Sequence, residues 1–297
     1  MRSVGGLICL LFFWQVIMAQ SYFYKENIVE PDWLVEAGFG AGWMNCLTDL
    51  GGKIGNRPRA MNWQGIRPAA AIFAIATYQQ TIGFRVQYVR GSVGAADSLI
   101  GSGNAGSRYD RNLHFKSNIT EITLMLEFYP FALSEGNIST CRLQLYVKGG
   151  VGWYRFNPQA RIKNQWVNLQ PLHTEGQGFS VADKLLQDSY SLDQLNLPVG
   201  IGMRWEAGPF MHLRLEGLYR ILFTDYFDDV STRYADPRQF ALYLTPAHAA
   251  LAVMASDRRR SGQPFQNSEI RGNPSKNDAF FHFQLSFSVL LNRKKDH

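Results

Sequence analysis

Charge and cysteine are both scarce in this sequence. Charged residues make up 18% of the 297 residues, below the roughly 25% of an ordinary soluble domain. The three cysteines are Cys9, Cys46 and Cys141, and no cluster of His, Cys and Asp has zinc-site spacing. The formal net charge is +6, but no basic run is interleaved with aromatics as a nucleic-acid site requires. We therefore expect no cofactor, no metal and no nucleic-acid partner.

Long apolar runs are absent after the N-terminal segment. Residues 7–18 are apolar and follow the basic residue Arg2, but this run is shorter than the about 20 residues of a membrane-spanning helix. The arrangement is typical of a secretory signal. We predict a signal peptide over residues 1–19, which contains Cys9, and one exported domain over 20–297. The remaining classes are a soluble secreted protein, a periplasmic protein and an outer-membrane β-barrel.

Strict alternation of apolar and other residues is the dominant pattern. In 33–44 (WLVEAGFGAGWM) the aromatics fall on one face, whereas Glu36, Gly38, Gly40 and Gly42 fall on the other. A period of two predicts a β-strand. Residues 68–78 are apolar on both faces and give the weakest of eight such patterns. The predicted strands cover 33–44, 68–78, 82–88, 121–128, 142–153, 194–206, 211–223 and 281–291.

Strand length and loop spacing favour a membrane barrel. Strands of about 9–11 residues are long enough to cross a bilayer when tilted. Short gaps (79–80, 131–140 and 207–210) alternate with long ones (45–67, 91–118, 157–190 and 224–278). Short periplasmic turns, long extracellular loops and an even strand number characterise outer-membrane barrels. We predict an all-β fold, an eight-stranded antiparallel transmembrane barrel in the cell outer membrane, in contact with its lipid.

The non-aromatic face of the strands is rich in glycine and in charges of both signs. A soluble lipocalin-like barrel would instead expose lysines and glutamates to water. An eight-stranded barrel has an interior only just wide enough for side chains, and buried charges require partners. We therefore expect ion pairs in the lumen. The candidate lumen charges are Glu36, Arg85, Glu121, Glu127, Lys148, Arg204, Arg214, Glu216 and Arg220, with Glu206 a further carboxylate.

The predicted topology separates the two remaining cysteines. With both termini in the periplasm, Cys46 ends a rising strand at the outer rim, and Cys141 begins another at the periplasmic rim. The barrel height exceeds the roughly 7 Å between Cα atoms that a disulfide tolerates. We expect no bridge between them; Cys141 is either buried and inert or pairs with a partner protein.

The long loops contain turn-forming strings with several carboxylates. In TDYFDDVSTRY (residues 224–234), Asp225, Asp228 and Asp229 suit a hard cation such as Ca²⁺, but no EF-hand pattern is present. The alternative, which we favour, is that these carboxylates cap turns or pair with Arg233. Residues 247–260 (AHAALAVMASDRRR) place Ala247, Ala250, Leu251 and Met254 at helical spacing, which predicts a short helix at the rim.

Five loop strings carry a resemblance. TDYFDDVSTRY followed by RGNPSKND (271–278) and an aromatic last strand, together with DLGG (49–52), FNP (156–158) and LQPLHTEGQG (169–178), resembles the PorG-type outer-membrane barrel proteins of the Bacteroidetes type IX secretion system. The resemblance spans nearly the whole predicted mature chain. The residues that carry it are Asp49, Gly51, Gly52, Asn157, Pro158, Thr224, Asp225, Tyr226, Asp228, Asp229, Arg271, Gly272, Pro274 and Asp278.

The resemblance implies a small barrel that is not the translocation pore and that contacts a periplasmic ring lipoprotein and its partner, of the PorK and PorN type. Three periplasmic segments are candidate docking surfaces, namely 20–32, 131–140 and 293–295. The alternatives are an OmpA-like structural barrel or a loop-borne surface receptor. A hydrolase would need a Ser–His pair; His114, His173, His248 and His282 are the possible bases, but no GxSxG string is present. We predict a non-catalytic component of type IX protein secretion.

Overall fold

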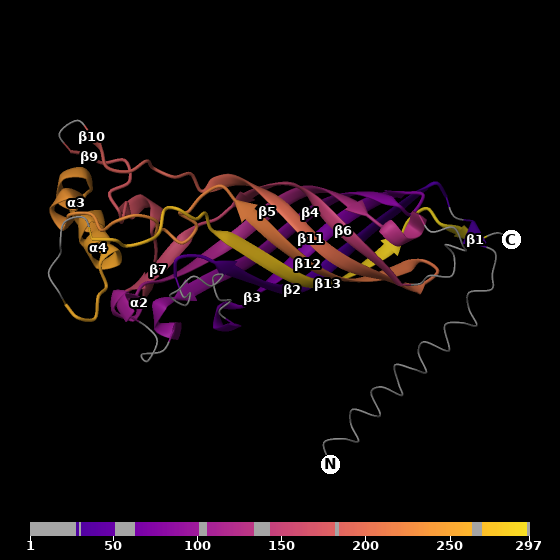
Figure 1. Cartoon of the computed structure of the whole chain (residues 1–297), viewed down its shortest axis with the longest axis horizontal. Coiled ribbons are helices and arrows are strands. Elements are labelled where there is room, and N and C mark those ends of the chain that lie inside the picture. Colours follow the sequence, from indigo (N-terminus) through magenta and orange to yellow (C-terminus); the bar gives the residue numbers. More distant parts are fainter. Residues whose placement is uncertain are drawn as a thin grey trace, which may run out of the picture.

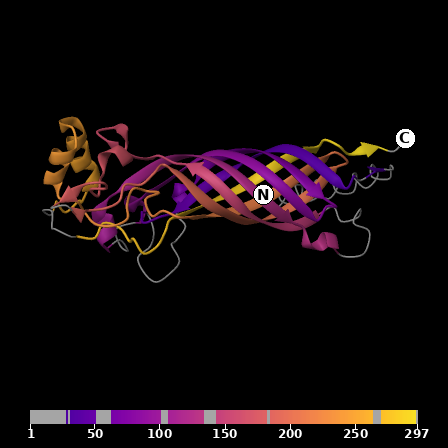
Figure 2. The ribbon, with the colours of Figure 1, turned by 90° about the horizontal axis from the view of Figure 1, so that it is seen from above.

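The computed structural model describes residues 28–29, 31–50, 63–100, 106–133, 143–181, 184–262 and 269–295. Eight long antiparallel strands form a closed barrel, in which each strand pairs with both neighbours and β13 returns to β2 (Figures 1 and 2). The strands are β2 (Trp33–Leu47), β3 (Arg67–Tyr78), β4 (Ile82–Ala96), β5 (His114–Phe128), β6 (Leu143–Arg155), β11 (Asp193–Gly208), β12 (Met211–Leu222) and β13 (Ala279–Leu290). The predicted fold class is confirmed, and each predicted strand lies at one of these eight.

The glycines of β2 lie where atoms of neighbouring strands approach closely. Its aromatic residues Phe39 and Trp43 are exposed on the outside, and Glu36 is fully buried in the lumen. A Cβ atom added at Gly38 would lie 2.7 Å from Cζ of Phe73, and one at Gly42 would lie 1.8 Å from the carbonyl oxygen of Phe283. The glycines therefore leave room for neighbouring side chains and for close approach of the next strand.

Strand β3, apolar on both faces, also alternates. Phe73 and Ile75 face the lumen and are buried, while Ile72 is exposed on the outside. Phe73 lies beside charged groups, since the guanidinium carbon of Arg85 is 4.0 Å from its ring centroid. An apolar residue in the lumen therefore has a partner in the cation over its ring.

Several strands continue past the exposed apolar side chains of the outer surface, towards the end of the barrel that carries the long loops. A hairpin, β7 (Pro158–Ile162) and β8 (Gln165–Asn168), follows β6 and pairs with the outer end of β5. Its turn residues Lys163 and Asn164 have φ of 47° and 66°, as a two-residue turn of positive φ requires. This hairpin was not among the predicted strands.

Short elements cover the same end. They are η1 (Trp63–Gly65), η2 (Asp97–Ile100), α2 (Gly106–Arg111), η6 (Gln170–Leu172), β9 (Ser180–Val181), β10 (Lys184–Leu185), α3 (Pro237–Tyr243) and α4 (Pro246–Ser256). The caps Asp236 and Thr245 accept backbone hydrogen bonds at the starts of α3 and α4, each followed by proline, a typical N-terminal signal. Figure 1 shows α3 and α4 at the far tip of this end.

The short helix predicted within 247–260 is present as α4. Ala249, Ala252 and Ala255 are buried, Leu251 and Met254 are half-buried against the same core, and Ala247 and Ala250 are exposed. α4 contacts η6, β7 and α3. The small alanine side chains allow this close packing. Among the residues described, no helix has the length and apolarity needed to cross a membrane.

The opposite end carries the first and last described strands and the short turns. Strand β1 (Ile28–Val29) pairs with β14 (Lys294–Lys295), and η4 (Pro130–Leu133) follows β5. The β1–β14 ribbon lies beyond the end of the barrel (Figure 1). Because the long loops lie at one end and the short turns at the other, the loop-rich end is extracellular and the ribbon is periplasmic. The predicted signal peptide (1–19) lies outside the described residues.

Candidate functional site

The lumen contains charged residues in three layers along β12. In the layer nearest the periplasm, Arg214 donates to both carboxylate oxygens of Glu36 at 2.8 and 2.5 Å. His212 lies 3.1 Å from the same carboxylate, and Ser288 donates to it at 2.7 Å. Glu36 lies on β2, so this contact joins strands that are far apart in sequence.

Glu216 is the centre of the middle layer. Its carboxylate accepts hydrogen bonds from Arg85 at 2.5 and 3.2 Å, Lys148 at 2.5 Å and Tyr146 at 2.5 Å. Gln284 and Ser286 also donate to it. Arg85 additionally donates to Glu127 at 2.9 Å. The two cations and two carboxylates of this layer balance one another.

The outer layer pairs Arg220 with Glu121. The guanidinium donates to the two carboxylate oxygens at 3.2 and 2.7 Å, and Asn196 donates to the same carboxylate at 2.8 Å. Above it, the guanidinium carbon of Arg220 lies 5.2 Å from the Phe280 ring centroid. Phe227 stacks on Phe280 with centroids 5.5 Å apart, and this apolar cluster covers the layer from the extracellular side.

Two predicted lumen charges have different partners from those expected. Arg204 donates to Gln144 and its guanidinium carbon lies 4.3 Å from the Tyr129 ring centroid, rather than meeting one of the candidate carboxylates. Glu206 pairs with Arg293 at the periplasmic rim. In the layer nearest the periplasm and in the middle layer, six charged side chains have no exposed surface, namely Lys148, Arg85, Arg214, Glu36, Glu127 and Glu216.

These layers fill the barrel. Eight strands enclose a lumen that side chains can occupy completely, and Arg85, Tyr146, Arg214 and Arg220 are among the largest fully buried side chains. Each removed cation would leave a carboxylate without compensation in a medium of low dielectric. The arrangement can therefore hold the strands together across the lumen, and it offers no wide aqueous path.

The histidine on the inner face of β13 does not meet a serine. His282 is fully buried, and neither ring nitrogen has a hydrogen-bond partner among the described residues. Ser286 donates to Glu216 and Ser288 to Glu36. His173 contacts the carbonyl oxygen of Gln177 at 2.5 Å. In the part of the chain that the structure describes, these contacts do not assemble the Ser–His pair of a hydrolase.

The loops at the extracellular end, including residues 169–178, 224–234 and 271–278, form a cap over the barrel. A second buried network lies in this cap, where Arg111 and Arg271 connect the loops. Arg271 donates to Glu175 at 2.9 Å and to the carbonyl oxygen of Asp229 at 2.6 Å. Arg111 donates to Asp97, with both distances 2.8 Å, and to the carbonyl oxygens of Asp49 and Arg271 at 2.9 and 2.5 Å. Sequence reasoning missed Arg111 and Asp97, because neither lies in an alternating strand pattern or in one of the loop strings.

Glu175 and Asp49 hold two of the five strings that carry the resemblance, 224–234 and 271–278. Glu175 accepts backbone hydrogen bonds from Ser231 at 3.0 Å and Thr232 at 2.8 Å. Asp49 accepts one from the backbone of Asn273 at 2.5 Å. A Cβ atom at Gly272 would lie 2.6 Å from the backbone of Ser231, so only glycine permits this approach.

The remaining loop residues lie in or beside this cap. Thr224 accepts from the backbone of Tyr226 at 3.1 Å and, through its carbonyl oxygen, from the backbone of Asp278 at 3.0 Å. Tyr226 stacks on Tyr190 at 5.0 Å, and Asp225 is buried. The residues Asn157 and Pro158 begin the β7–β8 hairpin, where the backbone of Asn157 donates to Ser117 at 2.8 Å. Pro274 borders an extracellular hollow of about 410 Å³; Gly51, Gly52 and Cys141 lie outside the described residues.

Asp228 caps a turn, and the carboxylate of Asp229 is held by two hydroxyl groups. Asp228 accepts from the backbone of Leu50 at 3.2 Å and of Val230 at 3.0 Å. Asp229 accepts from Thr174 at 2.5 Å and Tyr190 at 2.7 Å. Arg271 donates to the backbone carbonyl oxygen of Asp229. Within the described ranges no group of three or more His, Cys, Asp or Glu is arranged to hold a metal ion.

Burial changes the acidity of both aspartates. Burial, reinforced by the charge of Asp49, raises the pKa of Asp228 to about 7, although Thr48 and Arg111 oppose the shift. Burial raises the pKa of Asp229 to about 6 against the opposing effect of Arg271. Protonation is therefore easier in the folded cap than in an unfolded chain. Cys46, beside this region, is a free buried cysteine.

The barrel exterior is an apolar belt. Exposed apolar side chains cover its strands on all sides, including Phe39, Trp43, Ile72, Phe84, Val86, Leu124, Leu126, Leu145, Val147, Val151, Leu195, Val199, Ile201, Leu215, Tyr219, Phe283 and Leu285. Only a bilayer can cover a closed apolar band around a charged interior. The protein is therefore an outer-membrane barrel in contact with lipid, and the predicted localisation is confirmed.

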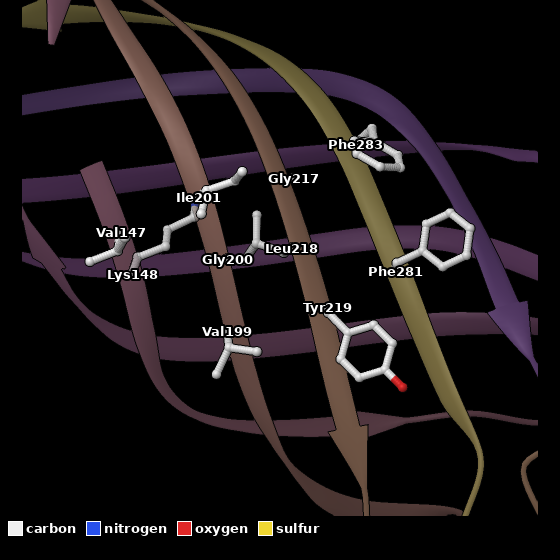
Figure 3. Close-up of a pocket in the computed structure, with 10 residues that line it drawn as sticks. All are labelled: Val147, Lys148, Val199, Gly200, Ile201, Gly217, Leu218, Tyr219, Phe281 and Phe283. Atoms are coloured by element: carbon white, nitrogen blue, oxygen red, sulfur yellow. The ribbon is translucent and has the colours of Figure 1, made fainter. Parts of the chain in front are cut away.

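One part of the belt is hollowed. Gly217 takes an outward position on β12, between Leu215 and Tyr219. Figure 3 shows Val199, Ile201, Tyr219 and Phe283 around it. They line an apolar hollow of about 690 Å³ on the lipid-facing side of β6, β11, β12 and β13.

Similar solved structures are outer-membrane proteins. Neisserial surface protein A (NspA) is 9% identical, with 88% of this chain and 98% of that chain covered and a TM-score of 0.39. A major outer membrane protein from Thermus thermophilus is 11% identical, with 88% and 100% covered and a TM-score of 0.39. OprG from Pseudomonas aeruginosa is 11% identical, with 90% and 97% covered and a TM-score of 0.37. The closed ring of strand pairs, rather than these likenesses, establishes the fold.

A family match covers more than half of the chain. No curated protein matches the sequence. Residues 66–243, from the start of β3 to the end of α3, match the family described as a domain of unknown function, DUF6089. This outer-membrane barrel belongs to the DUF6089 family.

Proposed function

We propose that this barrel is a non-catalytic outer-membrane component of type IX protein secretion, which docks or anchors a periplasmic ring of a PorK-type lipoprotein and its PorN-type partner. The resemblance of the loop strings supports the secretion role. The observation that carries the docking role is the filled lumen, with Glu216 and its partners across the middle of the barrel. A barrel without a path for cargo acts through its surfaces.

The periplasmic surface with the clearest means of docking is the β1–β14 ribbon. Asn292 donates to the carbonyl of Trp33 at 2.6 Å and accepts from the backbone of Val35 at 2.9 Å. Arg293 donates to the carbonyl of Pro209 at 2.7 Å. These contacts hold the ribbon against the rim. A two-stranded ribbon has outer edges to which a partner can add a strand, and Lys294 is exposed.

The experiment is a gentle-detergent purification of the tagged protein from native outer membranes, with co-purifying proteins quantified by mass spectrometry. We expect a ring-forming periplasmic lipoprotein and its partner in the wild-type eluate. The variant Lys294→Glu/Lys295→Glu should recover both at least about tenfold less, because it reverses the charge of the ribbon. The matched reversal Arg238→Glu, at the extracellular end, should recover them normally. Absence of both proteins from the wild-type eluate would refute the proposal.

The second candidate is a loop-borne surface receptor or an OmpA-like structural barrel. The observation that favours a receptor is the exposure of apolar side chains on the cap, where Leu242 is 80% exposed and Tyr243 is 45% exposed on α3. A receptor would retain a surface ligand and no periplasmic ring in the same purification. A structural barrel would elute alone.

A further inference from the structure

The barrel carries a one-sided collar of basic residues above its apolar belt. Arg90 lies two residues beyond the exposed Tyr88 on the outward face of β4, and Arg155 lies two residues beyond the exposed Trp153 on β6. Outward positions alternate along a strand, so both side chains continue the lipid-facing rows towards the extracellular end. The collar consists of Arg67, Arg90, Lys116, Arg155, Arg161 and Lys163.

On the other side of the barrel, the described outer ends of strands β2, β12 and β13 carry no basic residue on the outside. The corresponding positions hold Asn45 and Ala279, which are both buried, and Phe223, which is exposed just past β12. Arg155 has an acidic neighbour, Asp193, at 3.5 Å. Among the described residues, no ion pair satisfies the other five collar cations. The positive charge of the collar is therefore largely uncompensated by the protein.

Within the collar, two of the cations border a pocket of about 210 Å³ between η1, η2, the outer ends of β4 and β5, and the β7–β8 hairpin. Gly94 lies opposite Lys116 in the β4–β5 register. A Cβ atom at Gly94 would lie 3.9 Å from Nε of Arg67. The bare backbone of Gly94 thus separates two basic side chains, Arg67 and Lys116, both of which line the pocket.

An aromatic and an apolar wall complete the pocket. Trp166 is 46% exposed, and Nζ of Lys116 lies 4.5 Å from its ring centroid. His114 packs edge-on against the same ring at 6.3 Å. Leu99, which is 38% exposed, lines the pocket as well. A tryptophan beside lysine and arginine is the composition of a membrane–water interface.

The geometry points to a binding site for the phosphate group of an outer-leaflet lipid, held by Arg67 and Lys116 beside Trp166. Arginine binds phosphate through parallel N–H donors, and lysine binds it as a point charge. The volume suffices for a phosphate with several waters, since one water takes about 30 Å³ of liquid. The source is a lipid and not a soluble anion, because Lys116 takes an outward position on β5 and the exposed Leu99 and Trp166 offer apolar contact to the rest of the lipid.

The site does not depend on the secretion role. Its test uses the purified full-length protein in zwitterionic detergent, with native mass spectrometry and tryptophan fluorescence as readouts. The probes are bisphosphorylated lipid A, the same lipid after enzymatic dephosphorylation, and inorganic phosphate. We expect the phosphorylated lipid to remain bound in the gas phase and to change the fluorescence, with Trp166→Phe retaining the lipid but losing most of the fluorescence change.

The decisive variant is Arg67→Ala/Lys116→Ala. It should weaken binding of the phosphorylated lipid by about tenfold or more, because two charge-assisted contacts are lost. The control Arg238→Ala removes a cation from α3 and should bind normally. Arg67 and Lys116 are not buried, so their replacement should leave the fold intact. An unchanged shift in gel mobility between unheated and heated samples verifies that the variants fold. Equal binding by the double variant, equal binding of the dephosphorylated lipid, or binding of inorganic phosphate without the lipid would each overturn the inference.

Discussion

Replacing Glu216 by glutamine should destabilise the barrel more than any substitution of an exposed charge. The carboxylate of Glu216 compensates Arg85 and Lys148, both fully buried. After the substitution, Glu127 is the remaining carboxylate of this layer, and it contacts Arg85 at 2.9 Å. The layer then has two cations and one anion. Removal of one partner from a buried pair costs about 3–5 kcal/mol, and we expect a loss of this size in the free energy of unfolding.

A second variant tests whether charge balance is the cause. Glu216→Gln combined with Lys148→Met removes one charge of each sign, so we expect the double variant to recover at least about 2 kcal/mol relative to the single. Asp193→Asn is the exposed control. Its side chain is 40% exposed and its contact with Arg155 is 3.5 Å, so its cost should stay below about 1 kcal/mol.

The assay is urea unfolding from phospholipid vesicles, followed by tryptophan fluorescence and by heat-modified gel mobility. Equal m-values across the variants are required for the comparison. If Glu216→Gln costs no more than Asp193→Asn, the buried charges do not hold the barrel together. If the costs of Glu216→Gln and Lys148→Met simply add in the double variant, uncompensated charge is not the source of the lost stability.

Three further predictions concern the lipid face, the cap and its pH dependence. Val199→Arg should lower the free energy of unfolding from vesicles by about 2–4 kcal/mol, whereas Val199→Leu should be tolerated. Gly200→Arg should block assembly by steric overlap, since a Cβ atom at Gly200 would lie 2.3 Å from the carbonyl oxygen of Gly217. Equal tolerance of arginine at both sites would contradict the inside–outside assignment. Arg271→Ala should speed proteolysis of residues 224–234 without changing the barrel's gel mobility, because Glu175 loses its buried cation. The exposed Arg238→Ala on α3 should not. Asp228 and Asp229 have a pKa of about 7 and about 6 in the cap against 3.8 in the unfolded chain, so the cap should lose stability as pH rises from 4 through 7. Amide-exchange protection of residues 224–234, corrected for intrinsic exchange rates, should therefore be higher at pH 5 than at pH 8. Higher protection at pH 8 would exclude these two groups as the cause.

The fold was accessible from sequence because the barrel uses one repeated pattern. Alternation located all eight strands, and it placed Glu36 and its glycines on the lumen side, since one face of every strand meets lipid. The pairing of lumen charges was not accessible. Arg85 and Glu216 are 131 residues apart and meet across the lumen, so their contact depends on the stagger of strands that do not adjoin.

The extracellular end was less predictable for a different reason. The outer extensions of β4 and β5 lack a lipid-facing apolar row, and the β7–β8 hairpin is held by polar contacts such as Asn157 with Ser117. The buried side of α4 includes Ala249, Ala252 and Ala255, whose small side chains give only a weak apolar periodicity. Local periodicity carries no information on which loop supplies Arg111 or Arg271 to the cap.

The lumen of the barrel is filled by its own side chains. The conductance of the purified full-length protein in planar bilayers at neutral pH is the measurement that bears on this most closely. We expect no sustained open current, because the layers at Arg214, Glu216 and Arg220 occupy the lumen. Long-lived ohmic openings of the wild-type protein would be incompatible with a filled lumen.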